Sequence, residues 1–221
     1  MKIALLGKGK TGGKILEIAP ADLFIETFDR SHTPTLEKLI PFDVIVSFLP
    51  GDAFAELIPM LVETKKPVVT GSTGFTWPAE LGAILEKNNV SWIYASNFSL
   101  GVVAVKQLVE KLHKLTHLFH DKTLSIHEVH HTKKVDAPSG TALSMKEWLA
   151  EDCEVTSERT GDVVGLHTLK LETPSEIIRI EHEAKNRTLF AEGALWAARM
   201  INQTKPGLHP FQKVVEKQLS P

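Results

Sequence analysis

The sequence predicts an α/β protein in which a doubly wound parallel sheet is combined with a smaller α+β unit. Up to residue 99, apolar runs of strand length alternate with stretches of helical periodicity, the pattern of successive βαβ crossovers. After residue 100 a long helix is followed by short segments of alternating polar and apolar residues. A glycine-rich loop separates the first expected strand from the first expected helix. Together these features indicate two units with different architectures.

The composition is that of an ordinary globular protein. The 221 residues are 43% hydrophobic and 24% charged, enough for one large or two small domains. The net charge is -2, which argues against nucleic acid or a membrane surface as an electrostatic partner. Cys153 is the single cysteine, so an intrachain disulfide is excluded. No signal peptide or apolar run of membrane-spanning length is recognised, and we expect a cytoplasmic protein.

The first strand-length run ends in a glycine-rich loop. Gly7, Gly9 and Gly12 satisfy G-x-G-x-x-G at the position that a Rossmann-like dinucleotide-binding fold requires. Glycine permits the tight turn and lets the backbone approach a pyrophosphate at the helix N-terminus. A glycine-rich turn without a ligand is the alternative.

The second expected strand, over residues 22–28, ends at Asp29 and is followed by Arg30. An acidic residue at about this distance from the glycines binds the ribose 2′-hydroxyl of NADH, whereas an arginine can pair with the 2′-phosphate of NADPH. Both cofactors are therefore open on this evidence. Asp29 as an ordinary turn residue is the alternative.

The remaining elements of the first part follow the same alternation. Helices are expected over 33–40, 53–65 and 78–89, and strands within 42–50, 66–75 and 90–98. Ligands of such sheets bind at the carboxyl ends of the strands, where the loops Gly71–Gly74 and Ala95–Ser99 fall. Either loop is also compatible with plain turn chemistry.

The second part predicts a mainly antiparallel sheet beside a long helix. The helical run extends from residue 102 to about 119, and strands are expected over 123–129, 164–172 and 176–184. Further helices are expected over 190–201 and 211–219. The alternating strands would leave an apolar sheet face uncovered in one subunit, which favours assembly.

Folding needs alone do not explain the stretch EVHHTKKVDAPSGTA, residues 128–142. It places His130, His131, Lys133 and Lys134 within five residues, and Pro138 delays the next helix to about residues 139–141. The first N–H groups of that helix lack intrahelical partners and lie at the positive end of its dipole. The stretch therefore predicts a site for carboxylates or phosphate, with a solvated basic loop as the alternative.

The same region contains a match to the zinc-protease motif H-E-x-x-H, from His127 to His131. That motif requires a helix that puts both histidines on one face. The preceding residues instead show β-branched side chains and near-alternation. We therefore predict a strand running into a loop, and no metal.

The HHxxKVDAPSGTA string, the loops GSTGF and ASNFSLGV, and the segments VGLHT and FAEGALWAA resemble the 4-hydroxy-tetrahydrodipicolinate reductase (dihydrodipicolinate reductase) family over nearly the whole chain. The resemblance implies a Rossmann-like dinucleotide-binding domain over residues 1–99 and 187–221. It implies an inserted α+β domain for substrate binding and oligomerisation, as a homotetramer, over residues 100–186. The implied reaction is the reduction, by NADH or NADPH, of a cyclic dicarboxylate in lysine and diaminopimelate biosynthesis.

The resemblance also implies roles for single residues. His130 matches a proton donor, Lys134 a residue for proton donation or substrate binding, and His131 a substrate contact. Gly140 and Thr141 match a backbone cradle for a substrate carboxylate. The matched cofactor contacts are Gly7, Lys8, Gly9, Lys10, Thr11, Gly12, Asp29, Arg30, Gly71, Ser72, Thr73, Ala95, Ser96, Asn97 and Phe98.

The departures from the family pattern concern the cofactor more than the catalytic string. Lys10-Thr11-Gly12 replaces a usual Gly-Arg-Met, Pro50 stands where an arginine is frequent, and Lys133 where a histidine is common. Missing arginines weaken a 2′-phosphate site, whereas Lys8, Lys10 and Arg30 could restore one.

Two other functions are possible from the sequence. One is a nucleotide sensor without turnover, and the other is a dehydrogenase of another substrate, such as aspartate. The intact proton-donor string argues against the first, and APSGTA against the second.

Overall fold

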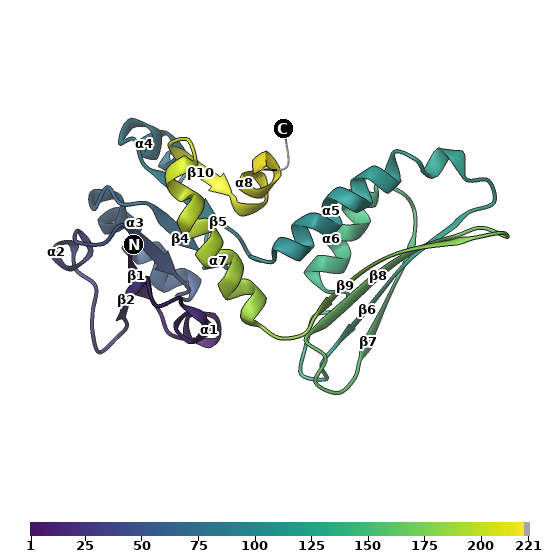
Figure 1. Ribbon diagram of the computed structural model, residues 1–221, viewed down its shortest axis with the longest axis horizontal. Helices are drawn as coiled ribbons and strands as arrows, with labels where there is room; N and C mark the ends of the chain where they lie inside the picture. The colour runs from purple at the N-terminus through teal and green to yellow at the C-terminus, as the bar shows by residue number, and fades with distance from the viewer. Residues whose placement is uncertain (219–221) are drawn as a thin grey trace. The chain divides into compact units, whose positions relative to one another are not determined.

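The computed structural model describes residues 1–218 and divides into two compact units. Residues 1–99 and the C-terminal segment from residue 188 form the first unit, and residues 100–187 form the second (Figure 1). The chain therefore leaves the first unit, builds the second, and returns to complete the first.

A six-stranded parallel sheet forms the centre of the first unit, with strand order β10-β5-β4-β3-β1-β2. Its strands are β1 (Lys2–Leu6), β2 (Phe24–Phe28), β3 (Val44–Ser47), β4 (Val68–Thr70), β5 (Ser91–Tyr94) and β10 (Gly207–Pro210). The strand order reverses at β1, because β2 pairs on one side of it and β3 on the other. Ligands of doubly wound sheets bind at this kind of switch point, beyond the carboxyl ends of the strands.

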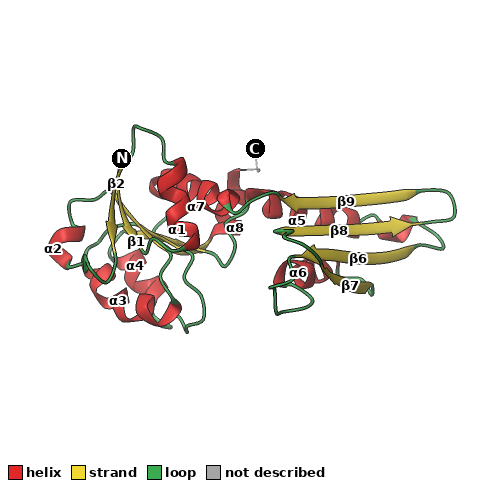
Figure 2. Ribbon diagram, turned by 90° about the horizontal axis from the view of Figure 1, so that it is seen from below, coloured by secondary structure: helices red, strands yellow, loops and turns green. Residues whose placement is uncertain are grey.

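Helices cover both faces of this sheet, as right-handed crossovers in opposite directions require (Figure 2). They are α1 (Lys10–Ile18), α2 (Leu36–Leu39), α3 (Gly51–Glu63), α4 (Leu81–Lys87), α7 (Thr188–Met200) and α8 (Phe211–Gln218), with a short 3-10 turn at Ile201–Gln203. On one face, Phe54 of α3 and Leu85 of α4 pack against Ile45, Val68 and Trp92 of the sheet. On the other face α1 packs against α7.

The second unit is a four-stranded mixed sheet in the order β7-β6-β8-β9. Its strands are β6 (Thr123–His130), β7 (Glu154–Arg159), β8 (Gly165–Glu172) and β9 (Ile177–Ala184). The β6–β8 and β8–β9 pairs are antiparallel, as predicted, whereas β6 and β7 are parallel. Helices α5 (Leu100–His113) and α6 (Gly140–Leu149) cover one face, where Val109, Met145 and Leu149 meet Ile126 and Leu169. A 3-10 turn, Thr116–Leu118, follows α5.

Two strands and one helix end differ from the sequence expectations. Strand β7 was not predicted because its sequence, EVTSER, carries a single strongly apolar residue. Strand β10 was not predicted because GLHP is short and contains a proline, which edge strands tolerate. Helix α5 ends at His113, earlier than expected. Residue 219 of the helix predicted over 211–219 lies outside the described residues.

The sheet face that points away from α5 and α6 is largely polar. Strand pairing places His127, Thr168 and Glu181 side by side on it, and Lys170 opposite Arg179. The expectation of an uncovered apolar face is therefore wrong for this sheet. Charged side chains instead alternate with the residues that fill the core.

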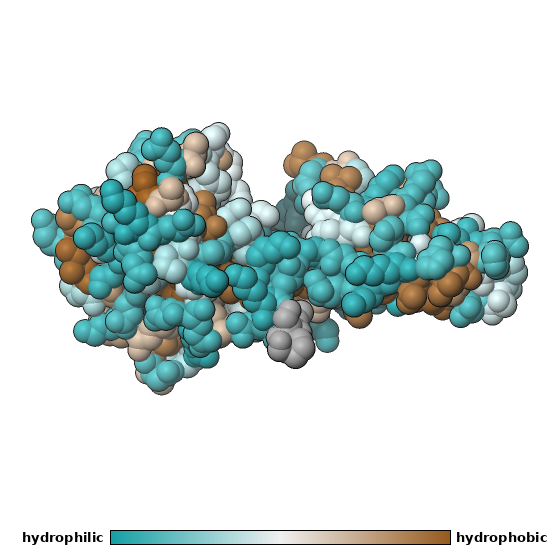
Figure 3. Space-filling model, turned by 90° about the horizontal axis from the view of Figure 1, so that it is seen from above, coloured by the Kyte–Doolittle hydropathy of each residue, from teal (hydrophilic) through white to brown (hydrophobic). Residues whose placement is uncertain are grey.

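Hydrophilic residues also dominate the surface seen in Figure 3, where apolar residues form separate patches. Among residues 1–218, no helix is both long enough and apolar enough to cross a membrane.

Candidate active site

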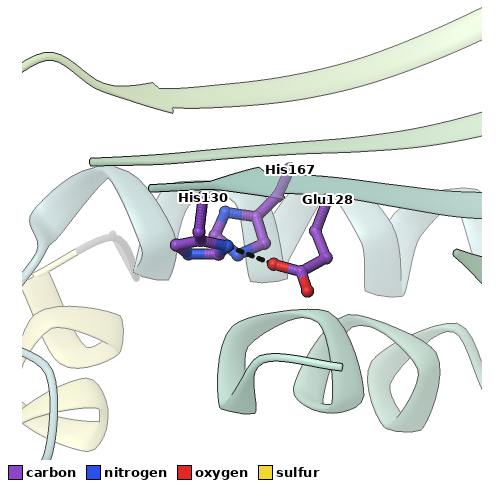
Figure 4. A group of neighbouring side chains, drawn as sticks. All are labelled: Glu128, His130 and His167. Carbon is purple, nitrogen blue, oxygen red and sulfur yellow. Dashed lines mark ion pairs between the residues drawn. The ribbon is translucent and has the colours of Figure 1, made fainter. Parts of the chain in front are cut away.

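Strand pairing in the second unit brings three buried ionisable side chains together. Glu128 and His130 are two residues apart on β6, so their side chains lie on the same face of the sheet. His167 of β8 is directly opposite Glu128. Nδ1 of His130 contacts Oε2 of Glu128, and the rings of His130 and His167 meet edge to face with centroids 5.0 Å apart (Figure 4). These side chains face α6.

The N-terminus of α6 is attached to this cluster. Ser139 is the N-cap, and its Oγ accepts a hydrogen bond from the Ala142 N–H at 3.3 Å. Its backbone N–H donates to Oε1 of Glu128 at 3.2 Å, and its Oγ lies 3.0 Å from Nε2 of His167. The prediction that a helix begins near residues 139–141 is confirmed. Gly140 and Thr141 occupy the first turn, where backbone N–H groups have no intrahelical acceptor.

Arg159, at the end of β7, completes the network. Its Nη2 donates to Oε1 of Glu128 at 2.8 Å and to the carbonyl oxygen of Asp136 at 2.6 Å. It therefore links the buried carboxylate to the loop that carries Lys134. Arg159 was not predicted as a site residue, because no expected strand covered it.

Lys134, one of the predicted cations, is paired within the protein. Its Nζ donates to both carboxylate oxygens of Asp136, at 2.7 and 2.8 Å. Lys133 is exposed, and the backbone N–H of His131 donates to the carbonyl oxygen of Val163 at 2.7 Å. A substrate carboxylate that binds Lys134 must therefore share it with Asp136 or displace that side chain.

The buried network sets the charges of its members. Burial raises the pKa of Glu128, but the hydrogen bonds from Arg159 and Ser157, with the charges of His130 and Arg159, bring it down to about 2. Burial lowers the pKa of His130, an effect that Glu128 opposes and Lys134 reinforces. Burial, reinforced by His130, lowers the pKa of His167 to about 4. At neutral pH the cluster is therefore an ionised carboxylate beside two neutral imidazoles.

The same three side chains are a potential metal-binding set. One donor atom from each of Glu128, His130 and His167 lies within 4.8 Å of the others. Two imidazoles and a carboxylate suit zinc or a related transition metal. Arg159 and Ser139 already hold the carboxylate, and Ser139 also pairs with His167. Glu128 and His167 are therefore already engaged by hydrogen-bond partners within the protein.

The H-E-x-x-H match does not form the zinc-protease arrangement. Residues 123–130 are a strand, as predicted, and His127 points to the opposite face, where its Nδ1 lies 2.9 Å from Oγ1 of Thr156. The set with His167 was missed because the register of β6 and β8, rather than local spacing, creates it.

The glycine-rich loop of the first unit follows β1 at the switch point of the sheet. Gly7 has φ +88°, in the region that favours glycine, and a Cβ on Gly12 would lie 2.0 Å from the Gly7 carbonyl oxygen. Gly9 caps α1 without a side-chain hydrogen bond, and a Cβ there would meet no heavy atom within 4 Å. A tight turn below an open helix N-terminus fits the pyrophosphate of a dinucleotide.

Asp29 follows β2 at the same edge of the sheet and is already paired. Oδ2 accepts from Nζ of Lys8 at 2.7 Å, and Oδ1 accepts from the N–H and hydroxyl of Ser31 and the N–H of His32. These contacts hold the pKa of Asp29 well below its usual range, and the contact with Lys8 has the largest effect. Arg30 is exposed. A cofactor ribose would meet the Lys8–Asp29 pair rather than a lone carboxylate.

The loops after β4 and β5 are neighbours because those strands pair in parallel. Gly71, Ser72 and Thr73 follow β4, and Ala95, Ser96 and Asn97 follow β5. The ring of Phe98 is buried between Phe48 and Phe211, with centroids 5.9 and 4.8 Å away. Phe98 can therefore offer a ligand only its backbone.

Comparisons with known proteins agree with this architecture. The family described as "Dihydrodipicolinate reductase, C-terminus" matches residues 101–215. The 4-hydroxy-tetrahydrodipicolinate reductase of Thermosipho africanus is 34% identical over 227 residues, which cover 98% of this chain and 99% of that protein. The protein of the same name from Bdellovibrio bacteriovorus is 30% identical over 224 residues, which cover 97% of this chain and 96% of that protein.

The solved structure of dipicolinate-bound dihydrodipicolinate reductase from Paenisporosarcina sp. TG-14 is similar, with a TM-score of 0.79 at 20% identity. The match covers 96% of this chain and 98% of that one. This likeness confirms the predicted Rossmann-like fold with a second α+β unit. The family match over more than half of the chain and the nearly full-length relatives confirm the resemblance found in the sequence. The chain belongs to the dihydrodipicolinate reductase family.

Proposed function

We propose that the protein reduces 4-hydroxy-tetrahydrodipicolinate, with loss of water, to tetrahydrodipicolinate at the expense of NADH or NADPH. Family membership supports this reaction. The observation that carries it is the junction of the HHxxK stretch with the N-terminus of α6 through Glu128. That junction puts groups suited to moving a proton beside groups suited to holding carboxylates.

The start of α6 and Lys134 are suited to a dicarboxylate. Backbone N–H groups of Gly140 and Thr141 lie at the positive end of the α6 dipole, where an anion is stabilised. Lys134 supplies a charge-assisted hydrogen bond when a substrate carboxylate takes the place of Asp136. The relative from Paenisporosarcina binds dipicolinate, a planar dicarboxylate of the same class.

A bound reduced nicotinamide would supply hydride to a ring carbon conjugated with the substrate imine. The ring nitrogen or carbon that becomes electron-rich then needs a proton. We assign the donation of this proton to His130 or Lys134. Because burial keeps His130 neutral, it can donate only after taking up a proton, which the charge of a bound dicarboxylate favours. Lys134 is the alternative donor.

We also propose that NADH is used at least as well as NADPH. Asp29 can accept hydrogen bonds from ribose hydroxyls and repels a 2′-phosphate. Lys8 offsets part of that repulsion, so a moderate rather than an absolute preference follows. Specificity constants for both cofactors test this proposal. A preference for NADPH of more than tenfold, about 1.4 kcal/mol, would contradict it.

A homotetramer formed through the second unit, and a cytoplasmic location, are carried over as predictions from the family resemblance. The exposed sheet face bears charges of both signs, including Lys170, Arg179 and Glu181, which suit a symmetric, self-complementary contact. Sedimentation at micromolar concentration should give about four times 24.4 kDa. A fully active monomer would refute this assembly.

A two-step titration tests the proposed reaction against its alternatives. Nicotinamide fluorescence first reports whether NADH and NADPH bind. The aldol product of pyruvate and aspartate semialdehyde is then added, and cofactor oxidation is followed. We expect oxidation that depends on both components. Binding without oxidation would indicate a nucleotide sensor. The absence of both binding and oxidation would indicate another enzyme.

A further inference from the structure

Glu128 is the most deeply buried charge of the site, and its two oxygens have different partners. Its side chain is fully buried on β6. Oε2 contacts Nδ1 of His130, whereas Oε1 accepts hydrogen bonds from the Ser139 N–H and from Arg159. One carboxylate therefore joins the proposed proton donor to the proposed carboxylate cradle.

The contact with Glu128 bears on which nitrogen of His130 carries hydrogen. An ionised carboxylate only accepts hydrogen bonds, so this contact favours the neutral ring with its hydrogen on Nδ1. Nε2 is then left with a lone pair that can receive a proton for transfer. On that side β8 presents Gly165, where an added Cβ would lie 3.0 Å from Nε2.

The surroundings of His130 contain no second acceptor of the same kind within hydrogen-bonding contact, among the residues described. His167 of β8 lies edge to face with the ring and pairs with Ser139. Arg159 of β7 and Lys134 of the loop between β6 and α6 contribute positive charge. Glu128 is thus the group that can fix both the orientation of the ring and its hydrogen.

We propose that Glu128 is a positioning residue, which holds His130 as the Nδ1–H tautomer and ties it to the N-terminus of α6. The inference rests on the proposed function for its kinetic consequences, but its structural part can be measured without turnover. It also gives a role to a carboxylate at a fully buried position, where apolar residues usually fill the core. The free-energy cost of burying the Glu128 carboxylate is offset by its hydrogen bonds from Arg159 and the Ser139 N–H.

Replacement by glutamine gives a specific expectation. In Glu128→Gln the amide oxygen must still accept from Ser139 and Arg159, because both are donors. The amide NH₂ then faces His130 and donates to Nδ1. The ring must therefore switch to the Nε2–H tautomer, and Nε2 can no longer take up the proton that is to be transferred.

Nitrogen NMR of the histidine rings, in chelator-treated protein at neutral pH, measures this switch. The His130 signals are assigned by their loss in His130→Gln. We expect the Nδ1–H tautomer in the wild type and the Nε2–H tautomer in Glu128→Gln. The Nε2–H tautomer in the wild type would overturn the proposal, and this result does not depend on the variant folding.

Kinetics supply the second readout. We expect Glu128→Gln to lower kcat by about 100-fold or more while KM changes much less, because general acid–base catalysis contributes roughly 10²–10⁴-fold. A variant with the kcat of the wild type would overturn the positioning role. An inactive wild type with the Nδ1–H tautomer would instead count against the proposed function, so the two failures are distinguishable.

Glu158→Gln is a matched control. Glu158 lies on β7, and its Oε2 is 3.8 Å from Nε2 of His127 on the exposed face of the same sheet. The control therefore removes a Glu–His pair on the opposite face of the same sheet, between β6 and β7, without touching the buried network. We expect kcat, KM and the His130 tautomer to stay at their wild-type values.

Discussion

At the residue scale, the site is defined by how its charges are already paired. Lys134 is held by Asp136, and Asp29 is held by Lys8. Substrate and cofactor must therefore exchange partners with existing ion pairs rather than fill vacant charges. Such exchange lowers the net free energy gained from each new interaction, because an ion pair of a similar kind must be broken to form it.

Replacement of Lys134 separates charge from proton donation. We expect Lys134→Ala to raise KM by about 10- to 100-fold, the value of a hydrogen bond to a charged group. Lys134→Arg keeps the charge but cannot act as an acid at neutral pH. Initial rates over a range of substrate concentrations distinguish the two roles. If Lys134→Arg is as inactive as Lys134→Ala, binding of a carboxylate is not the main role.

The small residue beside His130 offers a second prediction. A methyl group on Gly165 would lie 3.0 Å from Nε2 and 3.3 Å from Cδ2 of His130, so the ring must move. We expect Gly165→Ala to reduce kcat several-fold or more with native circular dichroism. Gly82→Ala in α4 is the control, since its Cβ would meet nothing within 4 Å and alanine favours helix by about 1 kcal/mol. Equal kcat in both variants would contradict the prediction.

At the element scale, most of the architecture could be predicted because it follows local periodicity. Alternation predicted β6, β8 and β9, and Pro138 with Ser139 predicted the start of α6. The polar strand β7 gave no such signal. Residues that long-range pairing brings together could not be predicted either. Glu128 meets His167 and Arg159 only because β8 and β7 flank β6, which no spacing along the chain reveals.

Alanine substitutions at Gly9 and Gly12, two of the three glycines of the first loop, should have different effects. A Cβ on Gly12 would lie 2.0 Å from the Gly7 carbonyl oxygen, so Gly12→Ala must shift α1 and lower both stability and cofactor affinity. A Cβ on Gly9 has open space around it, so Gly9→Ala should fold normally and lose only affinity. Thermal unfolding and NADH fluorescence titration check this pair. Wild-type affinity in Gly9→Ala would show that the pyrophosphate binds elsewhere.

At the scale of the whole molecule, the buried network makes the free energy of unfolding depend on pH. The pKa of His167 falls from 6.5 to about 4 on folding, and that of Glu128 from 4.5 to about 2. In both cases the unfolded chain binds the proton first as pH falls. The free energy of unfolding should therefore decrease from pH 6.5 towards 4 through His167, and from pH 4.5 towards 2 through Glu128.

Urea unfolding at several pH values measures this dependence. The His167 shift, from 6.5 to about 4, corresponds to at most about 3 kcal/mol. We expect His167→Gln to flatten the slope between pH 6.5 and 4. The exposed His120 provides the control, and His120→Gln should leave the slope unchanged. A slope that survives in His167→Gln would mean that other groups cause it.

The central claim is that the basic residues of the stretch 128–142 enable this protein to reduce a cyclic dicarboxylate. The most direct measurement compares cofactor oxidation by the wild type and by His130→Ala/Lys134→Ala, each supplied with the aldol product of pyruvate and aspartate semialdehyde. We expect steady oxidation by the wild type. In the double variant kcat/KM should fall by roughly 10²-fold or more while NADH binding is unchanged. Wild-type kcat and KM in the double variant would contradict the account.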